Sequence, residues 1–540
     1  MAAASLPELC LERIFEYLRY DLKTQYSCIL INRYWCSSLI AMLWENPFEM
    51  IKTKNKTKGN VRSNTYLINT YLIYLPKDTQ IPIELHETSK QPLFNYASFL
   101  RYISIQNIKN SVGKWARFNE TPKFKTFSSN LENNDTIGYI AEVLIKHLFT
   151  SSTYLKCVDL CREHLCPIPS VYELPNAETK LSQLQIFKCD DDKMTRFASK
   201  ISRDIQHLEI RLKAKASFDQ YYIPLKDFAM LIRAQRNLRK ILIQYSPTIY
   251  SRDENVCLWD NLMNHTKSLV NIIFVGVKFG FQFPLGCLSK FHNLRRLTLV
   301  DCEIGNVYPL DYLLPFFDED DDYQDNNPLL IRDIQSFHQV EFLSIRTSKI
   351  DINKIEILFR QAANSLRSLE LLDLDHLKNL ESFTQFFSNI TRLTVGINAR
   401  WKIVVSIVKS ANLLQELYVH DERSEIFRNN LIERYMYKPM TADSFLCEVG
   451  KAMGEQVYMF RFILDWYFYP NSLNTFLKRC NAKRLKILDF RKCKFFSNEH
   501  LNQVIEFCGG TLDYLYCEYH HTFTPTDLSR AKQVIRNVNC

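Results

Sequence analysis

The sequence is poor in glycine, which supplies only 12 of its 540 residues. Phosphate-cradling loops depend on glycine for close backbone approach, so a protein built on such loops is not expected. The common catalytic motifs are missing as well: there is no H-E-x-x-H, no G-x-S-x-G, no Walker A loop and no G-x-G-x-x-G. The sequence gives no indication of an enzyme, and neither a cofactor nor a metal is expected.

Long apolar runs are also absent. No stretch of 18 apolar residues occurs, so no transmembrane helix is predicted. Residues 1–6 lack a basic start and are followed at once by Pro7, which is not the pattern of a signal peptide. The 16 cysteines are scattered and many lie in apolar runs, which is typical of buried free thiols in a reducing compartment. We therefore expect a cytoplasmic or nuclear protein with no membrane partner.

A strong excess of one charge is lacking too. The net charge of +9 is spread over a long chain, and it does not require nucleic acid as a partner. Hydrophobic residues make up 46% and charged residues 24%, as in an ordinary folded chain. The most concentrated basic stretch is residues 52–62 (KTKNKTKGNVR). It is predicted to be a solvated loop, and a nuclear-import or phosphate-contacting role is the alternative.

What the sequence does contain begins with three short predicted helices in the first fifty residues. Pro7 suits the start of the first helix, whose apolar residues fall at helical spacing: Leu11, Ile14, Phe15 and Leu18. Asp21 and Asn32 are good N-caps for the second and third helices, and Pro47 is expected to end the third. Such a unit is small for a free-standing core and carries surplus apolar residues, so it is predicted to present a protein interface.

Residues 6–48 resemble the F-box. The match consists of a Leu-Pro start, an Ile-Phe-x-Tyr-Leu helix, a Leu-led second helix and an aromatic-rich third helix ending in Leu-Trp: Leu6, Pro7, Leu11, Ile14, Phe15, Tyr17, Leu18, Leu22, Leu30, Ile31, Asn32, Trp35, Leu43 and Trp44. The sequence departs from the family at residues 31–33, where Val-Cys or Val-Ser-Lys is more common, and at Ile29, a position often occupied by Ser or Val.

In the F-box family this module docks on the Skp adaptor, which joins it to a cullin and a RING protein. The resemblance implies that an adaptor interface is formed here by Leu6, Pro7, Leu9, Ile14, Leu30, Ile31 and Trp35. The alternative is a small helical cap that closes the N-terminal end of the following domain. In that case the same apolar side chains would face the first repeats.

The rest of the chain repeats the pattern apolar-x-x-apolar-x-apolar, in which the second and third apolar residues of a leucine-rich-repeat strand point into a stacked core. Fourteen matches begin at Leu100, Leu155, Leu181, Ile205, Leu238, Leu269, Leu294, Val340, Leu366, Ile390, Leu414, Val457, Leu485 and Leu512. From the second match on, most steps lie in or near the roughly 20 to 29 residues expected of such repeats. Two longer steps, after Leu294 and Leu414, contain polar insertions.

The predicted fold is therefore α/β, with a small three-helix F-box followed by a leucine-rich-repeat solenoid. One strand and one helical segment per repeat, such as residues 352–363, would form a curved horseshoe with a parallel sheet on its concave face. Cysteines follow several strands, as at Cys302 and Cys493, which resembles the cysteine-containing repeats often joined to F-boxes and implies a buried thiol in the turn.

Three segments are predicted: residues 1–48 as the F-box, 49–97 as a linker that packs between the modules, and 98–540 as the solenoid. The solenoid carries insertions near 306–335 and 421–445. The arrangement resembles that of the expanded fungal F-box families, which have a similar segment before the repeats.

Other clusters have simpler explanations than a site. The spacing of Cys157, Cys161, His164 and Cys166 is not a standard zinc pattern, and these residues are interpreted as core and turn residues, as are Cys517, His520 and His521. The acidic run 318–325 (DEDDDYQD) lacks the glycine and closing glutamate of a calcium loop, so a solvated insertion is expected, with substrate contact as the alternative. Of the aromatic run 466–470, half is predicted to be core and the rest a recognition patch.

Together these features predict a non-catalytic substrate-recognition subunit of an SCF-type ubiquitin ligase. The F-box would bind the Skp adaptor, and the repeats would hold a substrate protein, whose identity the sequence does not give, near the ubiquitin-loaded enzyme. One alternative is a leucine-rich-repeat interaction scaffold outside any ligase. A second is an enzyme whose site falls on the insertions.

Overall fold

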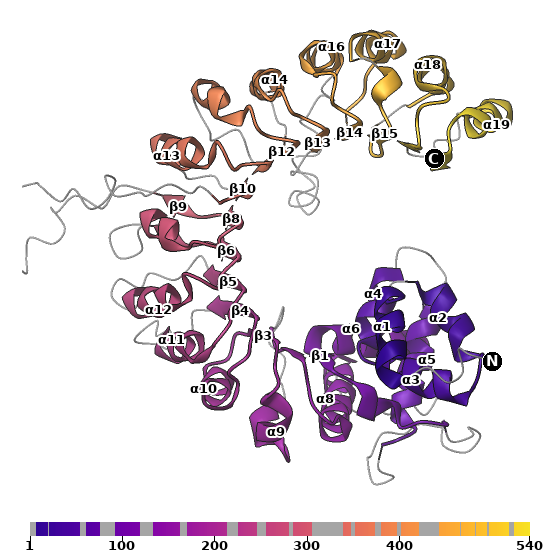
Figure 1. Ribbon diagram of the computed structural model, residues 1–540. Coiled ribbons are helices and arrows are strands. Elements are labelled where there is room, and N and C mark those ends of the chain that lie inside the picture. Colours follow the sequence, from indigo (N-terminus) through magenta and orange to yellow (C-terminus); the bar gives the residue numbers. More distant parts are fainter. Residues whose placement is uncertain are drawn as a thin grey trace, which may run out of the picture. The chain divides into compact units, whose positions relative to one another are not determined.

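A computed structural model gives the structure of the chain (Figure 1). It describes residues 7–19, 21–54, 61–75, 92–118, 133–161, 170–212, 225–245, 255–279, 285–304, 339–346, 352–372, 380–396, 401–420, 442–464, 466–480, 482–493, 496–517 and 523–539. The insertion predicted near 306–335, and residues 421–441 of the second insertion, lie outside the described residues.

The main element is a sheet of 15 strands whose spatial order follows the order of the chain. Its strands are β1 (Tyr102–Ser104), β2 (Cys157–Asp159), β3 (Ile186–Cys189), β4 (His207–Leu212), β5 (Lys240–Tyr245), β6 (Asn271–Val275), β8 (Arg296–Val300), β10 (Phe342–Arg346), β11 (Ser368–Leu372), β12 (Arg392–Gly396), β13 (Glu416–His420), β14 (Met459–Ile463), β15 (Ile487–Phe490), β16 (Tyr514–Cys517) and β17 (Asn537–Asn539). A separate pair joins β7 (Lys278–Phe279) to β9 (Glu303–Ile304).

The register of the strands stacks equivalent repeat positions on one another. Leu297 on β8 pairs with Leu343 on β10, which pairs with Leu369 on β11, and all three side chains are fully buried. The second inward position of the repeat behaves in the same way through Leu299 and Ile345. Because neighbouring strands are parallel and each repeat adds its two inward residues to a continuous core, the fold is a leucine-rich-repeat solenoid.

Thirteen of the fourteen predicted strand patterns have the correct frame, and one is wrong by three residues. At β3 the core residues are Leu184, Phe187 and Cys189, because Phe187 pairs with Val158 and with Leu208. Leu181, the predicted start of the pattern, is instead the last residue of helix α9 (Ala177–Leu181). A helix and a strand both accept apolar residues at short spacings, so the pattern alone did not separate them. Strand β17 was not predicted.

The chain divides into two compact units. Unit 1 comprises Met1–Ile241 and Thr248–His265. Its helices are α1 (Glu8–Tyr17), α2 (Leu22–Ile29), α3 (Arg33–Leu43), α4 (Pro47–Lys54), α5 (Val61–Leu72), α6 (Ile105–Phe118), α8 (Asn133–Ser151), α9, α10 (Asp192–Ile201), α11 (Leu225–Ala234) and α12 (Asn255–Leu262), with the 3₁₀ segments η4 (Tyr96–Phe99), η5 (Val171–Glu173) and η6 (Met263–His265).

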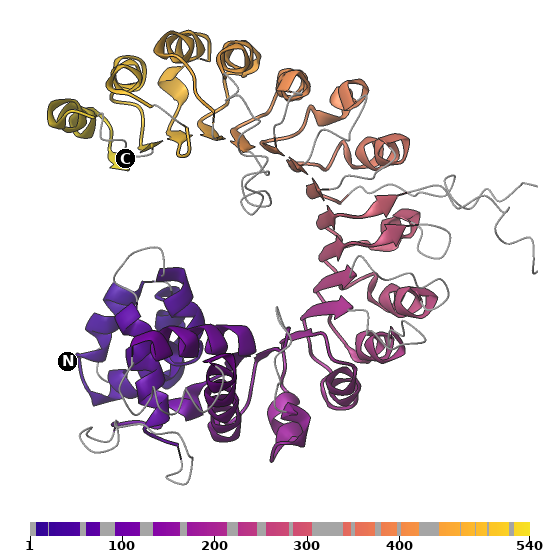
Figure 2. The same cartoon turned by 180° about the vertical axis from the view of Figure 1, so that it is seen from behind.

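Unit 2 comprises Leu242–Pro247 and Thr266–Cys540. Its helices are α13 (Ile352–Ala362), α14 (Trp401–Ser410), α16 (Asp443–Ala452), α17 (Pro470–Arg479), α18 (Asn498–Cys508) and α19 (Pro525–Val534), with the 3₁₀ segments η7 (Leu285–Lys290), η11 (Leu380–Phe387) and η14 (Ala482–Arg484). Within this unit the strands form one layer and the helices the other, as both views show (Figures 1 and 2).

The cysteines after strands make the predicted turn contacts. Cys302 and Cys493 are fully buried, and their thiols donate to backbone carbonyls of the preceding repeat, Phe274 O at 3.5 Å and Phe462 O at 3.3 Å respectively. Eleven described cysteines are free thiols, as expected. Cys517 is an exception because it is disulfide-bonded. Among the described residues, no helix is both long and apolar enough to cross a membrane.

Candidate functional site

The three N-terminal helices enclose a small core of their own. Leu11 and Phe15 from α1 pack with Cys28 from α2 and with Trp35 and Leu39 from α3. The rings of Phe15 and Trp35 meet edge to face with centroids 5.5 Å apart. This core fixes the relative positions of α1, α2 and α3, and so fixes which of their remaining apolar side chains face outward.

The predicted caps position these helices. Asp21 Oδ1 accepts a hydrogen bond from the Thr24 backbone N–H at 3.1 Å, and Asn32 Oδ1 accepts one from the Trp35 backbone N–H at 2.8 Å. Both contacts satisfy donors that the first helical turn leaves free. The prediction for Pro47 is wrong, because α3 has already ended at Leu43 and Pro47 begins α4. Proline fits the first turn of a helix, where no N–H is needed.

Several residues assigned by resemblance to an adaptor interface are uncovered. Leu30 is 70% exposed, Ile31 56% and Ile14 38%, and Pro7 is also exposed. Leu6 lies outside the described residues, as does the side chain of Leu9. Trp35 is only 9% exposed, so the structure places it in the helical core and not on the surface.

Sequence reasoning did not assign three exposed tyrosines to this surface: Tyr17, Tyr26 and Tyr34. Tyr26 on α2 and Leu30, the residue that follows α2, are four positions apart, and Ile14 and Tyr17 are three apart on α1, so the members of each pair lie close together. The four-residue spacing of Tyr26 and Leu30 is visible in the sequence, but spacing alone does not tell whether a helix face is buried or exposed. We call the exposed residues Ile14, Tyr17, Tyr26, Leu30, Ile31 and Tyr34 the helical apolar surface. Tyrosine is enriched at protein interfaces, and a group of exposed large apolar residues marks an interaction site.

The helical unit joins the first repeat through Glu45. Its backbone carbonyl accepts hydrogen bonds from the N–H groups of Arg101 and Tyr102 at 3.0 and 3.2 Å, where β1 begins. Its carboxylate pairs with Lys156 at 3.0 Å and with Arg19 at 3.5 Å. Within the described part of the chain, four residues of the helical apolar surface stay more than half exposed beside this junction: Tyr17, Tyr26, Leu30 and Ile31. The attachment of the three helices to the repeats therefore leaves that surface open to solvent.

The predicted linker begins inside α4, which starts at Pro47. Its described part contacts both neighbours within unit 1. Tyr71 on α5 is fully buried and lies against Trp44 at 5.6 Å and Phe48 at 5.8 Å, measured between ring centroids. On the other side, Asn69 accepts a hydrogen bond from the Trp115 indole on α6 at 2.6 Å. Residues 55–60 of the basic stretch lie outside the described residues.

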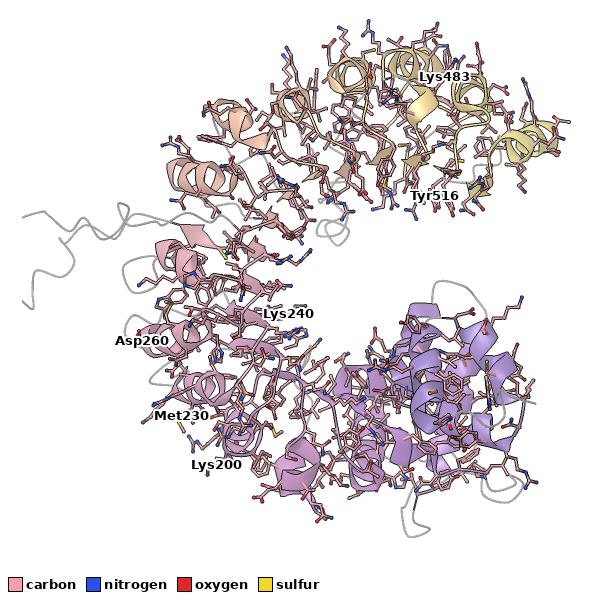
Figure 3. The ribbon with its side chains drawn as sticks, in the orientation of Figure 1. Lys200, Met230, Lys240, Asp260, Lys483 and Tyr516 are labelled. Atoms are coloured by element: carbon pink, nitrogen blue, oxygen red, sulfur yellow. The ribbon has the colours of Figure 1, made fainter. Side chains whose placement is uncertain are left out.

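The second candidate surface is the side of the sheet that faces away from the helices, which we call the sheet face. Its side chains occupy the variable positions of the repeat pattern. Tyr516 lies on this side of unit 2, whereas Lys483 lies on the helix side (Figure 3). Lys240 and Asp260 are divided in the same way between the strand and helix sides of unit 1 (Figure 3).

In unit 1 the sheet face carries a row of charges that compensate one another. Lys188 Nζ lies 3.6 Å from Asp159 and 3.3 Å from Glu209, and Arg211 lies 2.7 Å from Glu209. Burial by itself would lower the pKa of Lys188, but the two carboxylates raise it above its usual value. With two positive and two negative groups, this row has no net charge and little capacity left for a charged ligand.

In unit 2 the sheet face carries arginines and tyrosines around one buried carboxylate. Asp489 is fully buried, and it accepts two hydrogen bonds from the Arg491 guanidinium at 2.9 and 2.7 Å. Arg461 on the neighbouring strand approaches Asp489 to 4.0 Å. The Arg461 guanidinium lies 4.9 Å from the Tyr418 ring, and that of Arg491 lies 4.8 Å from the Tyr516 ring. We call these five residues the arginine–tyrosine patch.

Beside this patch lies a second polar group, Arg392, Glu416 and Tyr458, whose members hydrogen-bond to one another. Arg392 donates two hydrogen bonds to Glu416 at 2.6 and 3.2 Å, and the Tyr458 hydroxyl donates a third at 2.6 Å. Although burial favours a higher value, these hydrogen bonds hold the pKa of Glu416 below its usual range. The sequence contained the signal for both groups, since their residues flank the core positions of strand patterns. Which of them meet depended on the strand register.

The remaining candidate clusters do not form a metal site among the described residues. Cys157 and Cys161 are buried free thiols, and burial raises the pKa of Cys157 to about 12. His164, Cys166, His520, His521 and the acidic run 318–325 lie outside the described residues. In the aromatic run 466–470, Trp466 and Phe468 are buried and Tyr469 is exposed, and the role of the exposed part in recognition stays a prediction.

No family model matches the sequence, and no curated protein matches it. Among solved structures, the chain is similar to an internalin (inlF) from Listeria monocytogenes, with 15% identity over 64% of this chain and 82% of that one and a TM-score of 0.28. It is also similar to the Rad7 and Elc1 complex in yeast, with 14% identity over 78% of this chain and 92% of that one and a TM-score of 0.34. At these values the likenesses support no functional assignment.

Proposed function

We propose that this chain is the substrate-recognition subunit of an SCF-type ubiquitin ligase, acting in the cytoplasm or nucleus. In this proposal the helical apolar surface binds the Skp adaptor, and through it a cullin and a RING protein. The sheet face binds the substrate protein. The chain itself performs no chemistry, because holding the substrate beside a ubiquitin-loaded enzyme raises its effective concentration at the transfer site.

The observation that carries the proposal is the exposure of Ile14, Leu30 and Ile31, which are apolar residues at the positions where the F-box resemblance puts the adaptor contact. Under the alternative of a helical cap, these side chains would pack on the first repeats. Leu30 and Ile31 are instead more than half exposed, and Glu45, which bonds to the first repeat, lies on another part of the helical unit; both observations support the proposal. Apolar side chains left open on so small a unit are expected to be covered by a partner.

The sheet face supports the second half of the proposal. It presents variable side chains on a rigid parallel framework, the surface that repeat proteins use for binding. It also carries tyrosine and arginine, two residue types that contribute most to binding energy at protein interfaces. In unit 2 these are Tyr418, Arg461, Arg491 and Tyr516.

The test is capture of the Skp adaptor by the purified full-length chain. The wild type is expected to retain the adaptor and cullin, and a Leu30→Ala/Ile31→Ala variant is expected to lose them. Because both side chains are exposed, the variant should stay folded. Leu93→Ala is the matched control, since Leu93 is a 91% exposed leucine in unit 1 outside the three helices. A folded wild type that captures no adaptor would refute the ligase assignment and leave an interaction scaffold.

A further inference from the structure

We propose that the arginine–tyrosine patch of unit 2 binds a carboxylate side chain of an acidic segment in a partner protein. This inference rests on one part of the proposed function, namely that the sheet face is the surface that binds the substrate. Its starting point is an imbalance of charge: Arg461 and Arg491 contribute two positive groups, and Asp489 contributes one negative group. One positive charge in the patch is therefore left over.

The patch also has more hydrogen-bond donors than acceptors. Asp489 is occupied by the fork of Arg491 and by the Arg491 backbone N–H at 3.2 Å. The Nε of Arg461 is buried and has no hydrogen-bond partner within the described part of the chain. A buried guanidinium N–H without an acceptor is costly, because it has lost water and gained nothing in exchange. Because Nε itself is closed to solvent, an incoming oxygen anion would bind the terminal nitrogens of Arg461, whose side chain is 26% exposed, and would compensate the charge of this guanidinium.

The geometry holds the two arginines in place before a ligand arrives. Asp489 anchors Arg491, and the rings of Tyr418 and Tyr516 lie against the two guanidinium groups at 4.9 and 4.8 Å. These contacts reduce the side-chain entropy that binding would otherwise cost. Arg491 is 49% exposed and Arg461 26%, so both can be reached from solvent. Guanidinium groups match the planar carboxylate and can hold it by two parallel hydrogen bonds.

The remaining charge selects the class of ligand. One uncompensated positive charge matches one carboxylate, whereas a phosphate dianion would remain half uncompensated. A nucleic acid would need a longer basic track than this, because its affinity comes from many phosphate contacts. The adjacent Arg392–Glu416–Tyr458 group is neutral and closed, so it adds no further charge. The patch therefore fits an acidic segment that presents a single Asp or Glu side chain at its centre.

The size of the patch sets the length of the segment. Tyr418, Arg461, Asp489 and Tyr516 lie on β13, β14, β15 and β16, which are successive neighbours in the sheet, and Arg491 directly follows β15. Three steps between strands span about 14 Å, a distance that roughly four to five extended residues cover. Partly exposed apolar residues beside the patch, Ile463 and Ile487, would contact side chains flanking the carboxylate.

The experiment uses biotinylated degenerate peptide libraries of about nine residues, long enough to cross the patch, with the central residue fixed as Glu, Gln, Lys or phosphoserine. Retention of purified full-length protein is measured on each library and on a labelled single-stranded oligothymidylate. The wild type is expected to favour the Glu library over the Gln library by about tenfold, the equivalent of one charge-assisted contact worth about 1.4 kcal/mol. This readout needs no adaptor, so its failure is distinct from failure of the ligase proposal.

Arg461→Ala is expected to reduce retention on the Glu library to the level of the Gln library. Arg461→Lys keeps the charge but loses the fork, and should recover only part of the preference. The matched control is Arg296→Ala, because Arg296 also lies on the sheet face of unit 2 and packs on an aromatic ring, that of Phe342 at 3.9 Å. Its preference should equal that of the wild type, and thermal melting of each variant checks that it is folded.

Three results would overturn the proposal. The first is equal retention of the wild type on the Glu and Gln libraries, including no retention on either. The second is retention on the phosphoserine library or the oligothymidylate alone, which would assign the patch to phosphate. The third is a Glu preference that survives in folded Arg461→Ala, which would place the acidic contact elsewhere.

Discussion

Replacing Trp35 by alanine separates the two roles that this residue could have in the N-terminal helices. The F-box resemblance places Trp35 in the adaptor interface, but its side chain is 9% exposed and lies in the core against Phe15, Leu11 and Leu39. Trp35→Ala is therefore expected to act by destabilising α1, α2 and α3. Leu30→Ala, in the same group of N-terminal helices, removes a side chain that is 70% exposed and should leave the stability of these helices unchanged.

The magnitude follows from burial. Truncating a buried tryptophan to alanine costs about 3–5 kcal/mol. The three helices span residues 8–43, and at about 0.05–0.15 kcal/mol per residue a segment of this length holds roughly 2–5 kcal/mol of stability. The loss is as large as the whole local stability, so the three helices should open while the rest of the chain stays folded. Leu30→Ala should change stability by less than about 0.5 kcal/mol.

The assay is hydrogen–deuterium exchange of the full-length chain followed by mass spectrometry. A loss of about 3 kcal/mol should accelerate exchange in α1, α2 and α3 by roughly a hundredfold. Peptides from α16 and α17 in unit 2 serve as the internal reference, because their protection should not change. Adaptor capture is measured on the same samples, and both variants are expected to lose it. Only Trp35→Ala is expected to lose protection from hydrogen exchange as well.

Unchanged exchange in α1, α2 and α3 of Trp35→Ala would refute this reasoning. If adaptor capture were lost at the same time, Trp35 would be a contact residue, and its burial in the helical core would not describe the free protein. Faster exchange in Leu30→Ala would equally contradict the exposure of that side chain.

Two further predictions concern the repeats. Burial, with the nearby charges of Lys240 and Lys188, lowers the pKa of His207 to about 4 in the folded protein. In the unfolded chain the pKa of this side chain is about 6.5. Between these two pH values the unfolded state binds more protons, so the stability of the folded state falls as the pH falls. Urea denaturation should show a loss of about 1 kcal/mol between about pH 7.5 and pH 5, reduced from the full linkage value because the ring is partly exposed, and His207→Gln should remove that part of the pH dependence. Gly276 has φ 68° and an added Cβ would lie 2.8 Å from the Tyr245 carbonyl oxygen, so Gly276→Ala should cost about 2–3 kcal/mol in the same assay.

Each of these predictions has a contradicting result. An unchanged pH dependence in His207→Gln would show that His207 titrates alike in the folded and unfolded chains. For the glycine, the matched control is Gly454→Ala, where an added Cβ would meet nothing closer than the Asn412 carbonyl oxygen at 4.0 Å. Equal stability losses in the two glycine variants would contradict a specific steric effect at Gly276.

Much of the fold was predictable because its determinants are local. Asp21 and Asn32 cap their helices through bonds to residues three positions away. The strand patterns were recognisable because consecutive repeats bury the same two positions, so the spacing of apolar residues is the spacing of the strands. The single wrong frame, at Leu181, occurred where a short helix ends just before a strand and both bury apolar residues.

The binding surfaces were decided by tertiary contacts. Leu30 and Trp35 are both apolar residues of the three N-terminal helices and their connections, and no local pattern separates them. Trp35 is buried because Phe15 of another helix lies against it, while Leu30 stays 70% exposed. Arg461 and Asp489 are 28 positions apart and meet only because β14 and β15 pair in that register. The amino-acid sequence by itself thus determined the repeats and the caps, which depend on near neighbours. Exposure and the meeting of charges depend on which distant segments pack together, and only the tertiary structure decided them.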